Sequence, residues 1–64
     1  MMICEALKAA RLKAGMTQEE VAEKLYISRI MIQNIESGKR KAPLDRLIQL
    51  ADLYKVTMDE LVGR

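Results

Sequence analysis

The side chains best suited to a chemical task lie between Arg29 and Ser37, on the face of a predicted helix that its apolar residues leave free. On a wheel that turns about 100° per residue, Met31, Ile32 and Ile35 fall on one side. The opposite side carries Ile30, Gln33, Asn34 and Ser37, with Arg29 at the border. Arginine can donate to guanine, the two amides can pair with adenine, and an aliphatic group can contact a thymine methyl. These residue types could therefore read DNA base edges.

A solvated polar face would give the same pattern, and for an arbitrary helix that is the commoner explanation. The run Lys39, Arg40 and Lys41 favours DNA, because a loop leaving such a helix would pass close to the phosphate backbone. Residues 28–46 carry five cations and two anions, a net +3, whereas residues 17–25 carry one cation and three anions, a net −2. Positive charge is thus concentrated beside the polar face, although the whole chain is only +2.

Two short helices joined by a tight turn position these side chains. Thr17 and Glu20 have the spacing of a capping box, which predicts a helix that starts at Gln18. Ser28 can cap the next helix and Gly38 can end it in the left-handed conformation. This pattern is typical of a helix-turn-helix, whose second helix enters a DNA major groove.

The chain resembles the Cro/cI-type phage-repressor helix-turn-helix family, also called Xre-like. The matching stretches are LKAARLKAGMTQEEVAEKL, ISRIMIQNIESGKRKAP and LDRLIQLADLYKVTMDELV, which together span nearly the whole sequence and are highly specific. The resemblance implies an all-α, compact five-helix globule of the lambda-repressor-like DNA-binding type. Its second and third helices would form the helix-turn-helix.

The resemblance also implies residue roles. The base-reading positions would be Arg29, Ile30, Gln33 and Asn34, and Gln18 would clamp a phosphate. With the residues flanking the third helix added, the predicted phosphate contacts are Gln18, Ser28, Ser37, Lys39, Arg40 and Lys41.

In relatives, an arginine of the first helix pairs with a glutamate near the end of the third, here Arg11 with Glu36. Glu36 lies between the core stripe and the Arg29 side of the wheel, where partial burial would require a cation. The alternative is two exposed charges that contribute little.

The sequence departs from the family at two positions. Many relatives have glycine at the turn, where the backbone is left-handed, but this chain has Tyr26. That conformation costs a non-glycine residue about 1 kcal/mol, so we expect the ring to pack or the hydroxyl to form a hydrogen bond, with a phosphate contact as the alternative. Ile30 stands where relatives often have a polar residue, and it could contact thymine methyls or another protein.

Composition predicts a single domain over residues 1–64. A chain of 64 residues buries only about 60% of its unfolded surface, too little for an enclosed active site. The expected inner stripes are Ile3, Leu7, Ala10 and Ala14 in the first helix and Leu44, Leu47, Ile48, Ala51 and Leu53 in the fourth. Thr57 and Glu60 predict a last short helix that places Leu61 in the core, and Leu12 is expected to be exposed.

Other classes of protein find little support. The chain has no histidine, and Cys4 has no base partner, so we expect no enzyme, cofactor or metal. Asp52, Asp59 and Glu60 are interpreted as solvated acids. No apolar run approaches the roughly 20 residues that span a bilayer, and no signal peptide is evident. These features predict a cytoplasmic protein, and the resemblance suggests a bacterium or its phage.

The predicted function is sequence-specific binding of double-stranded DNA by a transcriptional regulator, with repression favoured. One recognition helix contacts few base pairs, so we expect a homodimer on a pseudo-palindromic operator. Its interface is predicted on the last two helices, with Tyr54, Val56, Met58 and Val62 as candidates. The main alternative is a protein-interaction module, such as an antitoxin or the target of an anti-repressor. A domain that docks on DNA without reading it is a third possibility.

Overall fold

A computed structural model describes residues 2–63, which contain five α-helices and no strand. The helices are α1 (Ile3–Lys13), α2 (Gln18–Leu25), α3 (Arg29–Ser37), α4 (Leu44–Tyr54) and α5 (Met58–Val62). The predicted all-α, five-helix fold is confirmed. None of the helices described is both long and apolar enough to cross a membrane.

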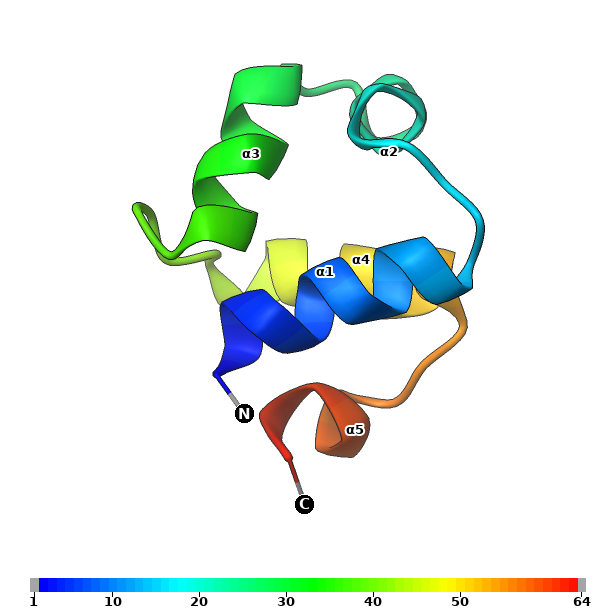
Figure 1. Ribbon diagram of the computed structural model, residues 1–64, viewed down its shortest axis with the longest axis vertical. Coiled ribbons are helices and arrows are strands. Elements are labelled where there is room, and N and C mark those ends of the chain that lie inside the picture. The colour runs from blue at the N-terminus through cyan, green and yellow to red at the C-terminus, as the bar shows by residue number, and fades with distance from the viewer. Residues whose placement is uncertain (1, 64) are drawn as a thin grey trace.

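The five helices surround one small core. In Figure 1, α1 crosses the middle of the molecule in front of α4, with α2 and α3 on one side and α5 on the other. The most deeply buried large side chains are Leu7, Val21, Ile32 and Leu50, and each comes from a different helix. Four helices therefore contribute to the same core, and α3 lies at one side of the molecule (Figure 1).

Side-chain caps begin three of the helices as predicted. The Thr17 hydroxyl accepts from the Glu20 N–H at 3.0 Å, and the Thr17 N–H donates to the Glu20 carboxylate at 3.0 Å. That backbone hydrogen bond lowers the pKa of Glu20. Thr57 and Glu60 form the same box at α5, and the Ser28 hydroxyl accepts from the Met31 N–H. These caps satisfy N–H groups that a helix start leaves without partners.

The same turn geometry joins α2 to α3 and α4 to α5. Tyr26 (φ 57°) and Lys55 (φ 58°) are both left-handed. The next residue in each case, Ile27 or Val56, donates its N–H back into the preceding helix at 3.0 Å. This bond between residues five apart is the Schellman arrangement, which satisfies the last carbonyls of a helix. The left-handed conformation of Lys55 was not foreseen from the sequence.

Tyr26 has the predicted left-handed backbone conformation, but its side chain forms neither of the contacts that were expected to offset the strain. Its side chain is 95% exposed and forms no hydrogen bond to residues 2–63. The expectation that its ring or hydroxyl would offset the strain is therefore wrong. The turn is held by backbone hydrogen bonds and by Ile27, which packs against the core.

The predicted inner stripe of α4 is displaced around the helix. Leu50, Ala51 and Tyr54 are buried, whereas Leu44 and Ile48 are 66% and 45% exposed. Because α4 places Leu50 and Tyr54 at the centre of its buried face, the positions near 44 and 48 turn toward solvent. Burial also raises the pKa of the Tyr54 phenol to about 12.

The stripe of α1 differs from expectation in a similar way. Leu7 is buried and Ala10 packs against the core as predicted, but Ile3 and Ala14 are exposed. Ala6 and Arg11 take the remaining buried positions. The two other predictions hold, since Leu61 is buried and Leu12 is exposed.

Replacement of Tyr26 by glycine should stabilise the protein. Glycine adopts the left-handed conformation without steric cost, and no packing is lost, so Tyr26→Gly should raise the free energy of unfolding by about 1 kcal/mol. Chemical denaturation measures the change. Tyr26→Ala keeps the Cβ atom and removes the ring, so its stability should stay close to that of the original chain. A clear loss of stability in Tyr26→Ala would show that the ring contributes after all.

Candidate nucleic-acid interface

Helix α3 divides its residues between the core and solvent. Ile32 and Ile35 are buried against the other helices. On the remaining surface Arg29, Ile30 and Gln33 are exposed, and Asn34 is half-buried. Ile30 is 61% exposed and packs against no part of the core, so its aliphatic side chain is available to another molecule.

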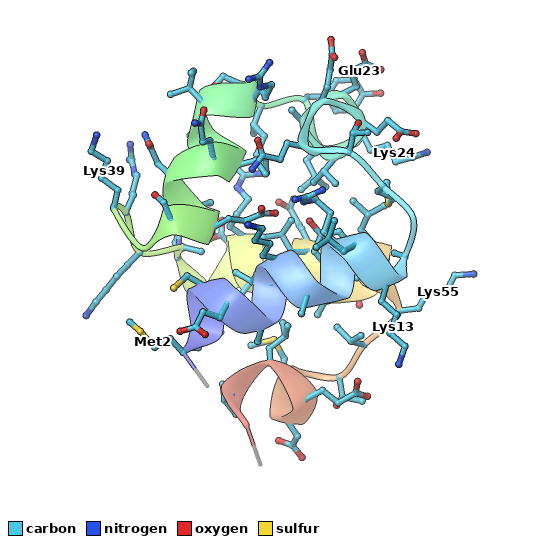
Figure 2. The ribbon with its side chains drawn as sticks, in the orientation of Figure 1. Met2, Lys13, Glu23, Lys24, Lys39 and Lys55 are labelled. Carbon is cyan, nitrogen blue, oxygen red and sulfur yellow. The ribbon has the colours of Figure 1, made fainter. Side chains whose placement is uncertain are left out.

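The loop that follows α3 carries exposed cations and is fastened to the helix. Gly38 ends α3 with a φ of 81°, and Lys39, Arg40 and Lys41 come directly after it. The Arg40 N–H and the Ser37 hydroxyl both donate to the Asn34 carbonyl at 3.2 Å. Figure 2 shows Lys39 extending away from the body of the molecule beside the end of α3. The loop cations therefore lie at a fixed place next to the outward face.

The Arg11 and Glu36 side chains form a buried ion pair. Arg11 Nε lies 2.7 Å from Glu36 Oε2, and Arg11 Nη2 lies 3.1 Å from Glu36 Oε1, so two parallel hydrogen bonds join the groups. The hydrogen bond to Glu36 is the chief cause of the raised pKa of Arg11. This bidentate geometry fixes the orientation of both side chains as well as their distance.

Two further groups join this pair. Arg11 Nη1 donates to the Met16 carbonyl at 2.8 Å, and Gln18 Nε2 donates to Glu36 Oε1 at 3.1 Å. The cluster of Arg11, Met16, Gln18 and Glu36, called the Arg11–Glu36 network below, links α1, the entry to α2 and the end of α3. Sequence reasoning missed both bonds. Nothing in the local pattern relates Gln18 to a residue 18 positions away, and the bond to the Met16 carbonyl depends on how the chain turns after α1.

The network positions Gln18 beside Arg29. Arg11, Thr17, Gln18, Glu19 and Arg29 line an open depression of about 340 Å³ at the start of α2. The structure thus brings a predicted phosphate contact and a predicted base-reading residue to one concave surface. The start of a helix also presents N–H groups that favour an anion such as a phosphate.

The two predicted serine contacts differ in what their hydroxyl groups can still donate. The Ser28 hydroxyl accepts the Met31 N–H, and the Ser37 hydroxyl donates to its own helix and accepts the Lys39 N–H at 3.4 Å. Ser28 therefore keeps its hydroxyl proton available for a phosphate, whereas the Ser37 proton is already donated within α3. Lys39, Arg40 and Lys41 form no ion pair within residues 2–63.

A short helix, a left-handed turn and a second helix with an exposed polar face define a helix-turn-helix domain. The sequence model of the helix-turn-helix family matches residues 7–61 of this chain. The chain belongs to that family.

Several curated relatives are similar over almost all of the chain. It is 44% identical to the HTH-type transcriptional regulator ImmR of Bacillus subtilis (strain 168) over 64 residues, covering all of this chain and 50% of the relative. It is 33% identical to the cryptic phage CTXphi transcriptional repressor RstR of Vibrio cholerae serotype O1 over 64 residues, covering 57% of that protein. The HTH-type transcriptional activator BcrR of Enterococcus faecalis is 40% identical over 59 residues, which are 92% of this chain and 29% of the relative.

These relatives are named as transcriptional regulators, and the chain spans about half the length of ImmR and RstR, and less of BcrR. Their names include both a repressor and an activator.

Removal of either member of the buried ion pair should destabilise the fold strongly. Arg11→Met and Glu36→Leu each leave an uncompensated buried charge, so each should lower the free energy of unfolding by about 3 kcal/mol. The double variant removes both charges and should be more stable than either single variant. Urea denaturation of the four proteins completes the cycle. Additive losses would show that the two charges do not interact.

Proposed function

We propose that residues 1–64 form one helix-turn-helix domain that binds double-stranded DNA sequence-specifically, as the DNA-binding part of a transcriptional regulator. Helix α3 lies in the major groove. The observation that carries this proposal is the exposed polar face of α3 with a fastened cationic loop beside it. The names of the relatives point to the same activity.

The outward residues divide into two roles. Arg29, Ile30, Gln33 and Asn34 read bases, and Gln18, Ser28, Ser37, Lys39, Arg40 and Lys41 contact phosphates. Base contacts supply specificity, whereas phosphate contacts supply affinity that falls with salt. The Ser28 hydroxyl accepts a backbone hydrogen bond and can donate its proton to a phosphate, whereas Ser37 must first release the Asn34 carbonyl.

Two kinds of substitution distinguish base-specific contacts from contacts with the phosphate backbone. Gln33→Ala and Asn34→Ala should each relax preference at particular base pairs, by about 1–3 kcal/mol per lost bidentate contact. Lys39→Gln should weaken binding to all sequences alike and reduce the slope of log K against log salt by about one. Selection of bound sites from a random DNA pool identifies the operator, and titrations at several salt concentrations measure both effects.

If Gln33→Ala and Asn34→Ala weaken binding to all DNA sequences equally, the domain binds DNA without recognising its base sequence. If binding to any partner is insensitive to salt, the partner is a protein. An antitoxin-like or anti-repressor-binding module is this second candidate, and the exposed Ile30 and Tyr26 side chains favour it.

The DNA-bound form proposed here is a homodimer on a pseudo-palindromic operator. The interface predicted from the sequence needs correction at three of its four residues, because Tyr54 is buried and Val56 and Met58 pack against the core. Val62 is 41% exposed and stays a candidate. Leu44 and Ile48 are better candidates, since they are exposed and one turn apart on the same face of α4. Exposed aliphatic side chains next to each other mark an interaction surface more often than single ones do.

Charged substitutions test this interface. Leu44→Glu with Ile48→Glu should abolish dimer formation on a two-half-site operator, so that one protein binds where two bound before. The control is Leu12→Glu, which alters a side chain that is 59% exposed on α1. Sedimentation of the protein–DNA complexes measures the stoichiometry. Two copies bound by the double variant would place the interface elsewhere.

Repression by occupancy is the proposed mode of action, because a protein seated in the major groove blocks other proteins from the same base pairs. The domain acts in the cytoplasm, where DNA is accessible in a bacterium. It acts without enzymatic chemistry, cofactor or metal, and the names of the relatives support a regulator rather than an enzyme.

A further inference from the structure

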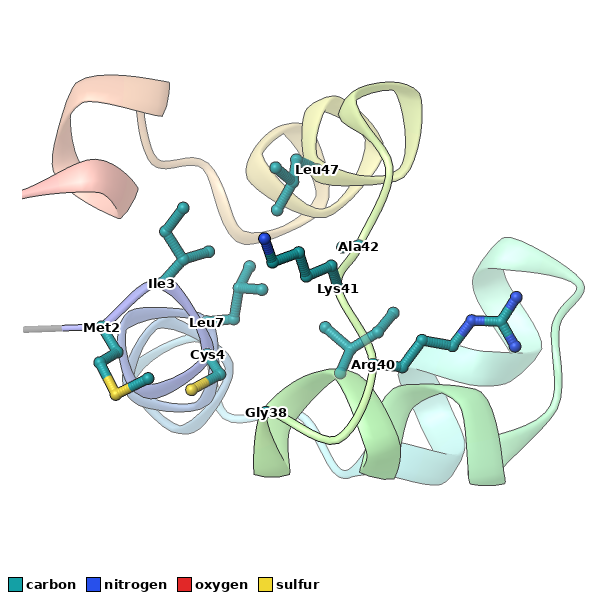
Figure 3. Close-up of a pocket in the computed structure, with 10 residues that line it drawn as sticks. Met2, Ile3, Cys4, Leu7, Gly38, Arg40, Lys41, Ala42 and Leu47 are labelled. Atoms are coloured by element: carbon teal, nitrogen blue, oxygen red, sulfur yellow. The ribbon is translucent and has the colours of Figure 1, made fainter.

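A second concave surface lies on the other side of the cationic loop. It is a pocket of about 470 Å³ between the start of α1, the loop after α3 and the first turns of α4. This volume falls in the range of small-molecule sites, about 300–1,000 Å³. Figure 3 shows the pocket with the start of α1 on one side and α4 opposite.

The wall of the pocket is mostly apolar. Ile3, Leu7, Ile35, Ala42 and Leu47 line it. Leu7 and Ile35 are buried by the core behind them, whereas Ile3 and Met2 remain exposed at the mouth. The pocket therefore offers apolar surface that the folded chain does not cover by itself.

Among residues 2–63, the charged side chains that line the pocket are both cationic. They are Arg40 and Lys41, and no carboxylate of this part of the chain lines it. In Figure 3 the Lys41 side chain extends from the loop toward Ile3 and Leu47, whereas Arg40 extends the other way. Helix α1 also begins here, and its cap, Met2, makes no side-chain hydrogen bond. The first N–H groups of α1 thus add partial positive charge near Lys41.

We propose that this pocket binds an apolar monocarboxylate of the fatty-acid type. The hydrocarbon chain packs against Leu7, Ile35 and Leu47, and the carboxylate pairs with the Lys41 ammonium. An apolar cavity with a single cation across it matches a molecule that has one anionic end and a hydrocarbon body. A neutral hydrocarbon leaves the Lys41 charge without a partner. Among residues 2–63, Lys41 is the cation whose side chain extends over the pocket, so a highly charged anion would be only partly neutralised there.

Occupation of the pocket should also weaken DNA binding, a consequence that rests on the function proposed above. Lys41 belongs to the same loop as Lys39 and Arg40, and Arg40 is anchored to α3 through the Asn34 carbonyl. A bound carboxylate holds the Lys41 charge over the pocket and neutralises it. One cation is then lost to the phosphate backbone.

The first experiment uses the protein without DNA. Decanoate is titrated into the 64-residue chain while amide chemical shifts are recorded, and decan-1-ol serves as the neutral probe of equal chain length. Saturable decanoate binding with shifts centred on residues 2–7 and 38–47 is expected. Loss of one charge-assisted contact should make decan-1-ol bind about tenfold more weakly.

Two matched variants assign the cation. Lys41→Met should weaken decanoate binding about tenfold, since it removes the charge and keeps an apolar side chain. Lys39→Met removes a cation from the same loop that does not line the pocket, and it should leave binding unchanged. Equal binding by decanoate and decan-1-ol, equal binding by the two variants, or no saturable binding at all would overturn the proposal. Circular dichroism confirms that each variant is folded.

The second experiment uses operator DNA selected as described above. Saturating decanoate should lower the affinity for DNA and reduce the salt slope by about one, and Lys41→Met should lose this response while Lys39→Met keeps it. Unchanged DNA affinity at saturating decanoate would overturn the regulatory link. If the chain binds no DNA, the proposed function fails, and the decanoate titration still decides whether the pocket takes a carboxylate.

Discussion

The Arg11–Glu36 network determines the orientation of α3 relative to the rest of the domain. Apolar contacts between short helices favour burial but tolerate rotation about the helix axis, because the hydrophobic effect is not directional. Two parallel hydrogen bonds between a guanidinium and a carboxylate do not tolerate it. Since Arg11 also holds the Met16 carbonyl and Glu36 also holds Gln18, one buried pair orients α3 relative to both α1 and the start of α2.

This constraint explains why the same helix can serve the core and a partner. With Glu36 fixed inward, Ile32 and Ile35 face the core, and Arg29, Ile30 and Gln33 face solvent. Both termini of α3 are then closed by the chain itself, through the Ser28 cap and the left-handed Gly38. A buried ion pair contributes little net stability, so the value of this one lies in the orientation that it imposes.

Features set by neighbouring residues could be predicted from the sequence, whereas features set by packing could not. The capping boxes and the Gly38 terminus each depend on a few adjacent residues, and all were expected. The left-handed turn at Tyr26 was expected from the family resemblance, whereas the same turn at Lys55 was not foreseen. The rotation of α4 was not expected either, because 44, 47, 48 and 51 form as good a wheel stripe as 47, 50, 51 and 54. Which stripe is buried depends on where Tyr54 fits among the other helices. The bond from Gln18 to Glu36 likewise exists only in the folded chain.

The cationic loop is constrained at both ends, and this gives its charges different surroundings. At its start, bonds from Ser37 and Arg40 to the Asn34 carbonyl keep Lys39 and Arg40 beside the outward face of α3. At its end, Ala42 packs against the core and draws Lys41 across apolar side chains of α1 and α4. Lys41 therefore lies in different surroundings from Lys39 and Arg40, although the three charges are consecutive in the chain. The loop thus places one cation over the apolar pocket and keeps another beside α3, within three consecutive residues.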